Sequence, residues 1–270
     1  MNKKTLLILI LASASAFAAD VQISAVKELP PDSSMPTGPE GEAIKLGRDI
    51  VNDTQTHAKQ YIGNGLNCTS CHQIGGTKPG ALPFPGLSGQ FPQYNARAGK
   101  VITLQDRVNG CFSRSMNGKP LPFDSKEMTS VIAYMTWLST GIPSGQQWHG
   151  RGAPKVDLTG LTPNLENGKK VYAAQCASCH GAEGAGLYVD GKPTFPALWG
   201  EKSFNIGAGM ARLLTATPFV KADMPLSAPG SLSAQDALDV SAYFTNQPRP
   251  DFASKAGDWP KGGRPKDARY

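Results

Sequence analysis

The stretch Cys68-Thr69-Ser70-Cys71-His72 and the stretch Cys176-Ala177-Ser178-Cys179-His180 are two copies of one pattern, Cys-x-x-Cys-His. This pattern attaches c-type haem, because two thiols at this spacing add to the vinyl groups at one porphyrin edge and the next imidazole becomes the proximal iron ligand. A redox-active disulfide also uses Cys-x-x-Cys, but it does not need the histidine. The sequence therefore predicts two covalently bound haem c groups. The residues that would hold them are four cysteines and two iron-ligating histidines: Cys68, Cys71, Cys176, Cys179, His72 and His180.

The composition is that of globular domains rich in loops. The chain has 270 residues, of which 40% are hydrophobic and 18% charged, with 30 glycines and 22 prolines. This length fits one or two domains, and the glycines and prolines favour short elements joined by long loops. The formal net charge of +6 suits an anionic substrate or an acidic partner. No run of lysine and arginine is long enough to indicate nucleic-acid binding.

Residues 1–18 have the form of a secretory signal peptide. A basic start, Asn2-Lys3-Lys4, is followed by the apolar run Leu6–Ala12 and by the small-x-small cleavage site Ala16-Phe17-Ala18. The apolar run is too short to span a membrane as a helix, and no later stretch reaches that length. Because haem c is attached outside the cytoplasm, export agrees with the two motifs. We expect a periplasmic protein without a membrane span.

Helical patterns recur around each motif. Residues 42–52 and 167–175 precede the two motifs, and residues 124–139 and 233–246 follow them. In the two later segments apolar residues return at helical spacing, a serine can cap each start, and a proline follows each end. Gly168, in front of the second motif, would let another helix cross at close range. The order helix, haem motif, long loop, helix therefore occurs twice.

This order resembles the class I cytochrome c fold, in which an N-terminal and a C-terminal helix cross and loops wrap the haem. We expect a mainly α protein with two such domains in tandem, loop-rich and joined by an extended linker. In chain order, the expected segments are a signal peptide (1–18), an N-terminal arm (19–41), a first cytochrome c domain (42–142), the linker (143–163), a second cytochrome c domain (164–248) and a C-terminal tail (249–270).

The distal ligand decides much of what a haem does. In electron-transfer cytochromes a methionine thioether usually occupies the sixth position of the iron and raises its potential. In the second domain Met224 precedes a proline and stands shortly before the last predicted helix. Met210 is the second candidate, and Lys221 is a third that would bind through its amine. We expect Met224 to be the distal ligand.

The corresponding loop of the first domain, residues 108–120, offers two sulfur atoms. Met116 lies at the matching distance from the following helix, but no proline follows it. Cys111 is the fifth cysteine and belongs to neither motif. As a thiolate on iron it would lower the potential and place a sulfur nucleophile at the haem. The residues alone leave both candidates open.

The segment Gly110–Gly118, Gly-Cys-Phe-Ser-Arg-Ser-Met-Asn-Gly, is the most specific sequence in the loop. In a chain with two Cys-x-x-Cys-His motifs it resembles the di-haem thiosulfate dehydrogenases. Residues 204–212 and 221–225 agree with that family as well, so the resemblance extends over nearly the whole chain after residue 18.

The resemblance also implies a ligand set. The first haem iron would be held by His72 and Cys111. The second would be held by His180 and Met224. In that family a lysine adjacent to the methionine can exchange with it, but here Asp223 precedes Met224, which departs from the family pattern.

The resemblance implies a reaction in which two thiosulfate ions join to form tetrathionate and release two electrons, and the reverse reaction would use the same site. The first domain would be catalytic, and the second would pass electrons to an external acceptor, another cytochrome or a high-potential carrier. Thiosulfate is a dianion, so its site needs cationic and hydrogen-bonding side chains. Near Cys111 there are seven: Arg97, Lys100, Arg107, Arg114, Ser115, Asn117 and Lys119. We expect Cys111 to supply the catalytic sulfur and four of the seven to contact substrate: Arg97, Arg114, Ser115 and Lys119.

Three other functions fit parts of the sequence. A tandem di-haem electron carrier would use Met116 and Met224 as distal ligands and would not respond to thiosulfate. A di-haem peroxidase would need an open iron site and usually a longer chain, and the loop around Cys111 does not favour it. A cytochrome subunit of a larger sulfur-oxidising complex would carry a modified cysteine and would purify with a partner.

Overall fold

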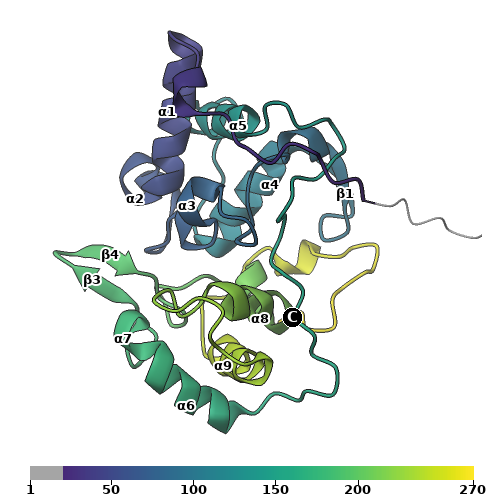
Figure 1. Ribbon diagram of the computed structural model, residues 1–270. Helices are drawn as coiled ribbons and strands as arrows, with labels where there is room; N and C mark the ends of the chain where they lie inside the picture. Colours follow the sequence, from purple (N-terminus) through teal and green to yellow (C-terminus); the bar gives the residue numbers. More distant parts are fainter. Residues whose placement is uncertain (1–20) are drawn as a thin grey trace, which may run out of the picture.

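The computed structural model describes residues 21–270, which form two helical units packed against each other (Figure 1). The predicted signal peptide lies outside these residues. The helices of the first unit are α1 (Pro39–Asn52), α2 (Thr54–His57), α3 (Gln73–Gly76), α4 (Leu104–Gly110) and α5 (Lys126–Leu138). Those of the second unit are α6 (Leu165–Gln175), α7 (Ala177–His180), α8 (Leu213–Asp223) and α9 (Ala234–Asn246). The predicted mainly α architecture with two tandem units is confirmed.

Each unit also carries a short antiparallel hairpin. Strand β1 (Gln93–Asn95) pairs with β2 (Lys100–Ile102) in the first unit, and β3 (Leu187–Val189) pairs with β4 (Lys192–Phe195) in the second. Residues Cys111–Ser115 continue α4 as one turn of π-helix. Single turns of 3-10 helix lie at Asp32–Ser34, Lys59–Tyr61, Cys68–Ser70, Ser88–Gln90, Gly209–Ala211 and Lys255–Gly257.

The helices start where the sequence provides caps. The Ser125 hydroxyl accepts a hydrogen bond from the Met128 N–H at 3.1 Å, and the Ser233 hydroxyl accepts one from the Asp236 N–H at 3.0 Å. Each bond satisfies a backbone donor that a helix leaves free at its first turn. Helix α1 starts at Pro39, ahead of the predicted start at 42, because proline at the first helical position has a preset φ and needs no hydrogen-bond donor.

In each unit the first helix crosses the last helix. Helix α1 packs on α5, and α6 packs on α9 (Figure 1). A Cβ added to Gly47 of α1 would lie 1.9 Å from the Ser130 carbonyl oxygen, and one added to Gly168 of α6 would lie 2.1 Å from the Asp239 carbonyl oxygen. Both distances are far below atomic contact, so glycine alone permits these crossings. The close approach predicted at Gly168 is confirmed, and Gly47 repeats it.

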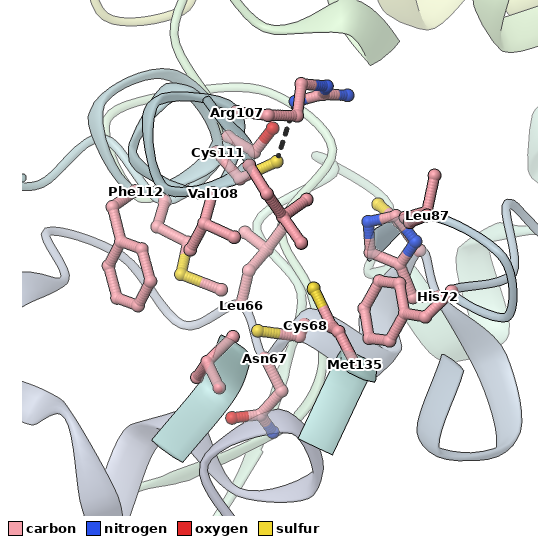
Figure 2. Close-up of a pocket in the computed structure, with 16 residues that line it drawn as sticks. Leu66, Asn67, Cys68, His72, Leu87, Arg107, Val108, Cys111, Phe112 and Met135 are labelled. Carbon is pink, nitrogen blue, oxygen red and sulfur yellow. Dashed lines mark hydrogen bonds between the residues drawn. The ribbon is translucent and has the colours of Figure 1, made fainter. Parts of the chain in front are cut away.

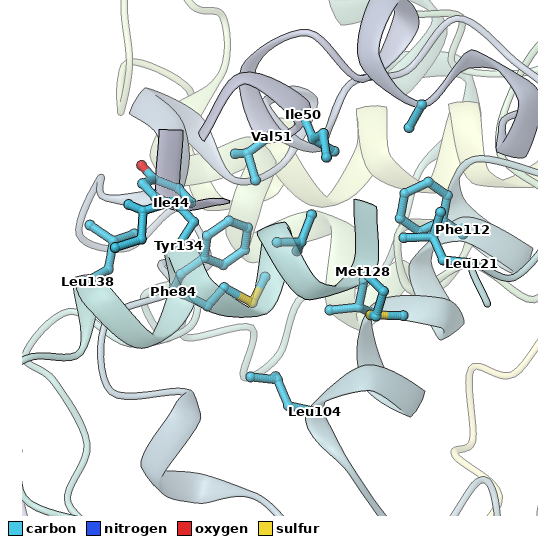
Figure 3. Close-up of a cluster of buried hydrophobic side chains, with 14 of the residues drawn as sticks. Ile44, Ile50, Val51, Phe84, Leu104, Phe112, Leu121, Met128, Tyr134 and Leu138 are labelled. Carbon is cyan, nitrogen blue, oxygen red and sulfur yellow. The ribbon is translucent and has the colours of Figure 1, made fainter. Parts of the chain in front are cut away.

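A hydrophobic core forms at each crossing. In the first unit, side chains of α1, α5 and the π-helical turn make up a buried cluster (Figure 3) that includes Ile44, Val51, Met128, Tyr134 and Phe112. In the second unit the cluster includes Tyr172, Trp199, Val240 and Phe244. Leu66, which comes from the first unit in the chain, is buried in the second cluster. The two units therefore meet through a shared apolar contact beside the first haem motif.

The linker and the tail both pack on the first unit. The backbone of Gln147 bonds with Gln22 and Ser24, and the carbonyls of Gly150 and Gly152 accept bonds from residues 80 and 82. The expected linker (143–163) is thus attached to the first unit over its first half. The tail returns to the same unit, where the Trp259 N–H bonds to the Arg97 carbonyl at 2.8 Å. The expected domain boundaries stay a prediction.

Helix α8 lies in a stretch for which the sequence predicts only a long loop. Pro218 lies within the helix. The start of the helix is held by a residue far along the chain: Asp267 accepts hydrogen bonds from the Leu214 N–H at 2.8 Å and from the Arg212 side chain.

Across residues 21–270, none of the helices combines the length and the apolar character that a membrane crossing needs.

Candidate active site and haem pockets

The two motif histidines share one hydrogen-bonding arrangement. Nδ1 of His72 lies 2.6 Å from the Leu82 carbonyl oxygen, and Nδ1 of His180 lies 2.9 Å from the Pro196 carbonyl oxygen. A carbonyl can only accept, so in each ring Nδ1 carries the proton and Nε2 keeps its lone pair. This outer bond is the usual way in which a protein orients a metal-binding imidazole. Both histidines are therefore prepared to ligate iron through Nε2.

Each motif faces an apolar cavity. The first cavity is lined by Cys68, Cys71 and His72 together with apolar side chains that include Phe84, Leu87, Leu104, Val108 and Met135. The second is lined by Cys176, Cys179 and His180 together with Leu198, Phe204, Phe219, Val220 and Phe244. Paired thiols, an imidazole with a free Nε2 and apolar walls are what a covalently bound porphyrin requires. The residues present fit haem c in both places.

A short segment of the first unit separates the two cavities. Leu66, Asn67 and Cys71 line both of them. Cys71 is one of the two cysteines that attach the first haem, so this attachment lies at the wall of the second cavity. The two cavities are thus neighbours that share these three lining residues.

Cys111 projects from the π-helical turn into the first cavity, which His72 also lines. Turns of π-helix within α-helices often mark functional sites. Nη1 of Arg107 donates a hydrogen bond to Sγ of Cys111 at 3.2 Å (Figure 2). Arg107 precedes Cys111 by one helical turn, which brings the two side chains to one face. The cavity therefore has a thiol with a guanidinium bonded directly to it.

The thiols of the first cavity differ in acidity. Burial raises the pKa of Cys68 to about 11 and that of Cys71 to about 12. Burial also opposes ionisation of Cys111, but the charge of Arg107, which bonds to the thiol, outweighs it and lowers the pKa of Cys111 to about 6. Of these three thiols, Cys111 is therefore the one whose pKa favours the thiolate.

Met116 lies at the same cavity. It is buried, and its backbone N–H bonds to the Cys111 carbonyl at 2.9 Å, so the two sulfur-bearing residues close one turn. Arg107, which lines the same cavity, bonds to the sulfur of Cys111. The geometry favours Cys111 as the distal ligand, and this assignment stays a prediction.

Two of the predicted substrate residues converge on the C-terminal tail. Nη2 of Arg114 lies 2.7 Å from Oδ1 of Asp258, and Nε of Arg97 lies 3.7 Å from Oδ2 of the same carboxylate. Tyr270 donates its hydroxyl to Asp258 at 2.6 Å, and the Arg97 guanidinium lies over the Trp259 ring. The structure thus brings the two arginines together, but it gives them protein partners outside the first cavity.

The other two predicted substrate residues are placed differently. Ser115 lines the first cavity, in the same turn as Cys111. Lys119 is exposed and does not line the cavity; its backbone N–H bonds to the Tyr61 carbonyl at 2.9 Å. Of the four residues, Ser115 is the one that lines the first cavity together with Cys111. The substrate-contact roles of Arg97, Arg114, Ser115 and Lys119 stay predictions.

Sequence reasoning counted Arg107 in the cationic cluster but did not select it as a site residue. The missed signal was its spacing: Arg107 and Cys111 are four residues apart on a continuous helical segment, which places them on one face. The sequence predicts a loop over residues 108–120, whereas residues 104–115 are helical, and only this helical geometry gives the spacing its meaning.

The second cavity has two methionines and no lysine at its wall. Met224 ends α8 and lines the cavity, as does Met210. Nζ of Lys221 donates to the Gly230 carbonyl at 2.8 Å, and Lys221 is not among the lining residues. This arrangement disfavours the amine as ligand. Met224 as the distal ligand stays a prediction, with Met210 as the alternative.

Comparisons with known proteins match both units. The family described as "SoxA/TsdA, cytochrome c domain" matches residues 55–144, and the family described as "Cytochrome C oxidase, cbb3-type, subunit III" matches residues 163–244. Both are families of cytochrome c domains or subunits, and each match includes one Cys-x-x-Cys-His motif. The chain therefore carries two covalently bound haem c groups.

Relatives match over most of the chain. It is 46% identical to a thiosulfate dehydrogenase of Psychrobacter arcticus over 243 residues, which are 90% of this chain and 74% of the relative. It is 44% identical to a thiosulfate dehydrogenase of Allochromatium vinosum over 236 residues, 85% of this chain and 87% of the relative. The solved thiosulfate dehydrogenase TsdBA of Marichromatium purpuratum superposes with a TM-score of 0.77 and 36% identity, covering 82% of this chain and 49% of that longer chain. By its sequence, its two haem pockets and its overall structure, the chain belongs to the family of thiosulfate dehydrogenases.

Proposed function

We propose that this protein oxidises thiosulfate: two thiosulfate dianions join through a new S–S bond to give one tetrathionate dianion and two electrons. The observation that carries the proposal is the bonded pair of Arg107 and Cys111 at the first haem cavity, in a chain of the thiosulfate dehydrogenase family. The balance needs no proton and no water. It needs a sulfur site, positive charge and two one-electron acceptors.

The protein supplies the sulfur site through Cys111. The guanidinium of Arg107 favours its thiolate form, as the lowered pKa of Cys111 indicates. A guanidinium has five N–H donors, and only one of those of Arg107 is used on Cys111. The remaining donors suit the oxygen atoms of a sulfonate group. Arg107 would therefore hold the anionic end of thiosulfate with the outer sulfur toward Cys111, and Ser115 could add one hydroxyl donor from the same turn.

Positive charge outside the cavity would attract the dianions. Arg97 and Arg114 share the single carboxylate of Asp258, so this cluster keeps an excess positive charge. Arg114 belongs to the turn that holds Cys111. A field of this sign raises the local concentration of an anionic substrate. We propose that these arginines steer thiosulfate toward the cavity.

When bound, each haem iron can accept one electron, and two haems match the two electrons released. His72 and Cys111 would hold the first iron, and His180 and Met224 the second. Leu66, Asn67 and Cys71 line both cavities, so the two sites are adjacent. Electrons would leave from the second unit to an external acceptor, another cytochrome or a carrier of high potential. The form of residues 1–18 supports a periplasmic location.

The test is a turnover assay on the purified, haem-loaded protein. Thiosulfate and a high-potential acceptor such as ferricyanide are added, and acceptor reduction and tetrathionate are both measured. We expect tetrathionate in proportion to acceptor reduced, and consumption of tetrathionate when a strong reductant replaces the acceptor. If neither changes while dithionite still reduces both haems, the protein is an electron carrier without substrate chemistry.

A further inference from the structure

One ion pair links the two units between their haem sites. Nζ of Lys78 lies 2.7 Å from Oδ1 of Asp223. The Asp223 side chain is 3% exposed and that of Lys78 is 26% exposed. Lys78 belongs to the first unit, in the loop after α3, and Asp223 is the last residue of α8 in the second unit. The pair is therefore a charge contact between the units with a buried carboxylate and a partly buried ammonium.

Each partner is tied to a proposed iron ligand. Nζ of Lys78 also donates to the side chain of Gln73 at 2.7 Å, and Gln73 directly follows His72. Gln73 is buried and lines the second cavity. On the other side, Asp223 directly precedes Met224, whose N–H bonds to the Val220 carbonyl at 3.0 Å and completes α8. The pair thus connects a residue next to the proposed proximal ligand of the first haem with the residue that precedes the proposed distal ligand of the second.

The energetics of the pair do not point to a role in stability. Oδ2 of Asp223 is buried and has no hydrogen-bond partner, so the carboxylate relies on Lys78. Removing two charges from water costs several kcal/mol per ion, and a buried pair returns that cost only when its remaining atoms are satisfied. Here one oxygen atom is not. A pair of this kind is better explained by the position and the charge that it maintains.

We infer that Lys78 and Asp223 are positioning residues that hold the Met224 end of α8 against the first unit and keep the distal side of the second haem electrically neutral. The inference rests on the proposed ligation of that haem by Met224. It explains why a buried carboxylate can stand next to an iron ligand: its charge is cancelled by a lysine from the other unit.

The sign of the effect follows from Coulomb's law. Ferric haem carries one more positive charge than ferrous haem. A lone carboxylate beside it favours the ferric form and lowers the potential, while a lone ammonium raises it, and the low dielectric of a buried site strengthens both effects. Lys78→Met should therefore lower the potential of the second haem, and Asp223→Asn should raise it. The double variant should return toward the wild-type value.

The experiment is a potentiometric titration of the holoprotein without thiosulfate. The second haem is followed through the charge-transfer absorption band that a thioether ligand gives to ferric haem. Lys78→Arg keeps the charge and should keep the wild-type potential. Lys221→Met is the matched control, because Lys221 lies on α8 but bonds to Gly230 and not to Asp223. Haem content and circular dichroism establish that each variant is folded.

Opposite shifts in the two single variants, with no shift in Lys221→Met, would support the inference. It is overturned if both single variants leave the potential of the second haem unchanged. It is also overturned if both shift it in the same direction with loss of the thioether band, since that would show only a loosened structure. Because no thiosulfate is used, failure here would leave the proposed enzymatic activity untouched, and a missing thioether band in the wild type would fault the Met224 ligation instead.

Discussion

The two haem-binding units share their framework and differ at the distal wall. Each has crossed helices with a glycine at the contact, and each has a histidine whose Nδ1 bonds to a backbone carbonyl. The first cavity is lined by Cys111 on a π-helical turn and by the guanidinium of Arg107; the lining of the second has Met210 and Met224, no arginine and no cysteine outside the haem motifs. Under the proposed roles, the same scaffold serves substrate chemistry in the first unit and electron exit in the second, and a few residues of the distal segment set the two apart.

The largest effect should come from removing the sulfur that sets the first pocket apart. Cys111→Gly should lower thiosulfate turnover by roughly a thousandfold or more, the scale for loss of a residue on which the reaction depends. Both haems should remain attached, because Cys68, Cys71, Cys176 and Cys179 are intact. Tetrathionate formation is the measurement. Met116→Leu is the control and should keep most of the activity; the reverse pattern would make Met116 the residue that matters.

Substitution of Arg107 should have the second-largest effect on activity, because Arg107 stabilises the Cys111 thiolate but does not supply the sulfur atom. Arg107→Leu should lower kcat/KM by roughly 10- to 100-fold, the range for residues that tune a metal ligand from outside. Arg107→Lys should recover part of the loss, since it keeps the charge but not the planar fork of donors. Steady-state kinetics with haem-loaded variants decide this. Equal activity in the leucine variant and the wild type would remove the Arg107–Cys111 pair from the mechanism.

Substitution of Met224 tests the proposed role of the second haem site in electron exit. Met224→Ala should abolish the thioether charge-transfer band of the second haem, lower its potential and slow delivery of electrons to the acceptor. Reduction of the first haem by thiosulfate should persist. Visible spectra and stopped-flow reduction separate the two steps. Met210→Leu serves as the control, and loss of the band in that variant alone would transfer the ligand role to Met210.

The smallest effect is expected on stability, from substitution of the glycine at the helix crossing that both units share. Gly168→Ala places a methyl group against the Asp239 carbonyl and should cost about 1–3 kcal/mol of the free energy of unfolding, the usual penalty of overpacking. Gly47→Ala should do the same in the first unit. Gly257→Ala is the control, because nothing lies within 4 Å of the Cβ it would add. Denaturant unfolding followed by circular dichroism measures the differences, and an undiminished stability in both helix variants would show that the crossings can relax.

Local signals allowed much of the fold to be predicted. The caps at Ser125 and Ser233 and the two haem motifs depend on residues within one or two helical turns. The crossing of α6 with a later helix was predicted from one glycine, Gly168. Helix α8 was missed because Pro218 interrupts its pattern and because its start is fixed by Asp267, which lies far along the chain. Contacts between distant segments were beyond such signals.

In the candidate site, too, local motifs could be predicted from the sequence, while contacts between distant segments could not. The thioether cysteines and proximal histidines are defined by a motif of five residues, so they could be predicted without the fold. The partner of Arg97 and Arg114 could not, since Asp258 comes from a tail that returns to the first unit. Likewise, nothing in the sequence places Leu66 in the core of the second unit or pairs Lys78 with Asp223. These contacts between units are what set the two haem sites side by side.

The most direct test of the whole account is a count of products without any external acceptor. The oxidised wild-type protein is mixed with excess thiosulfate under anaerobic conditions, and reduced haem and tetrathionate are measured in the same sample. The account predicts one tetrathionate for every two haems reduced, because the coupling of two thiosulfate ions releases two electrons and each haem accepts one. Haem reduction with no tetrathionate, or haems that stay oxidised with thiosulfate but are reduced by dithionite, would contradict it.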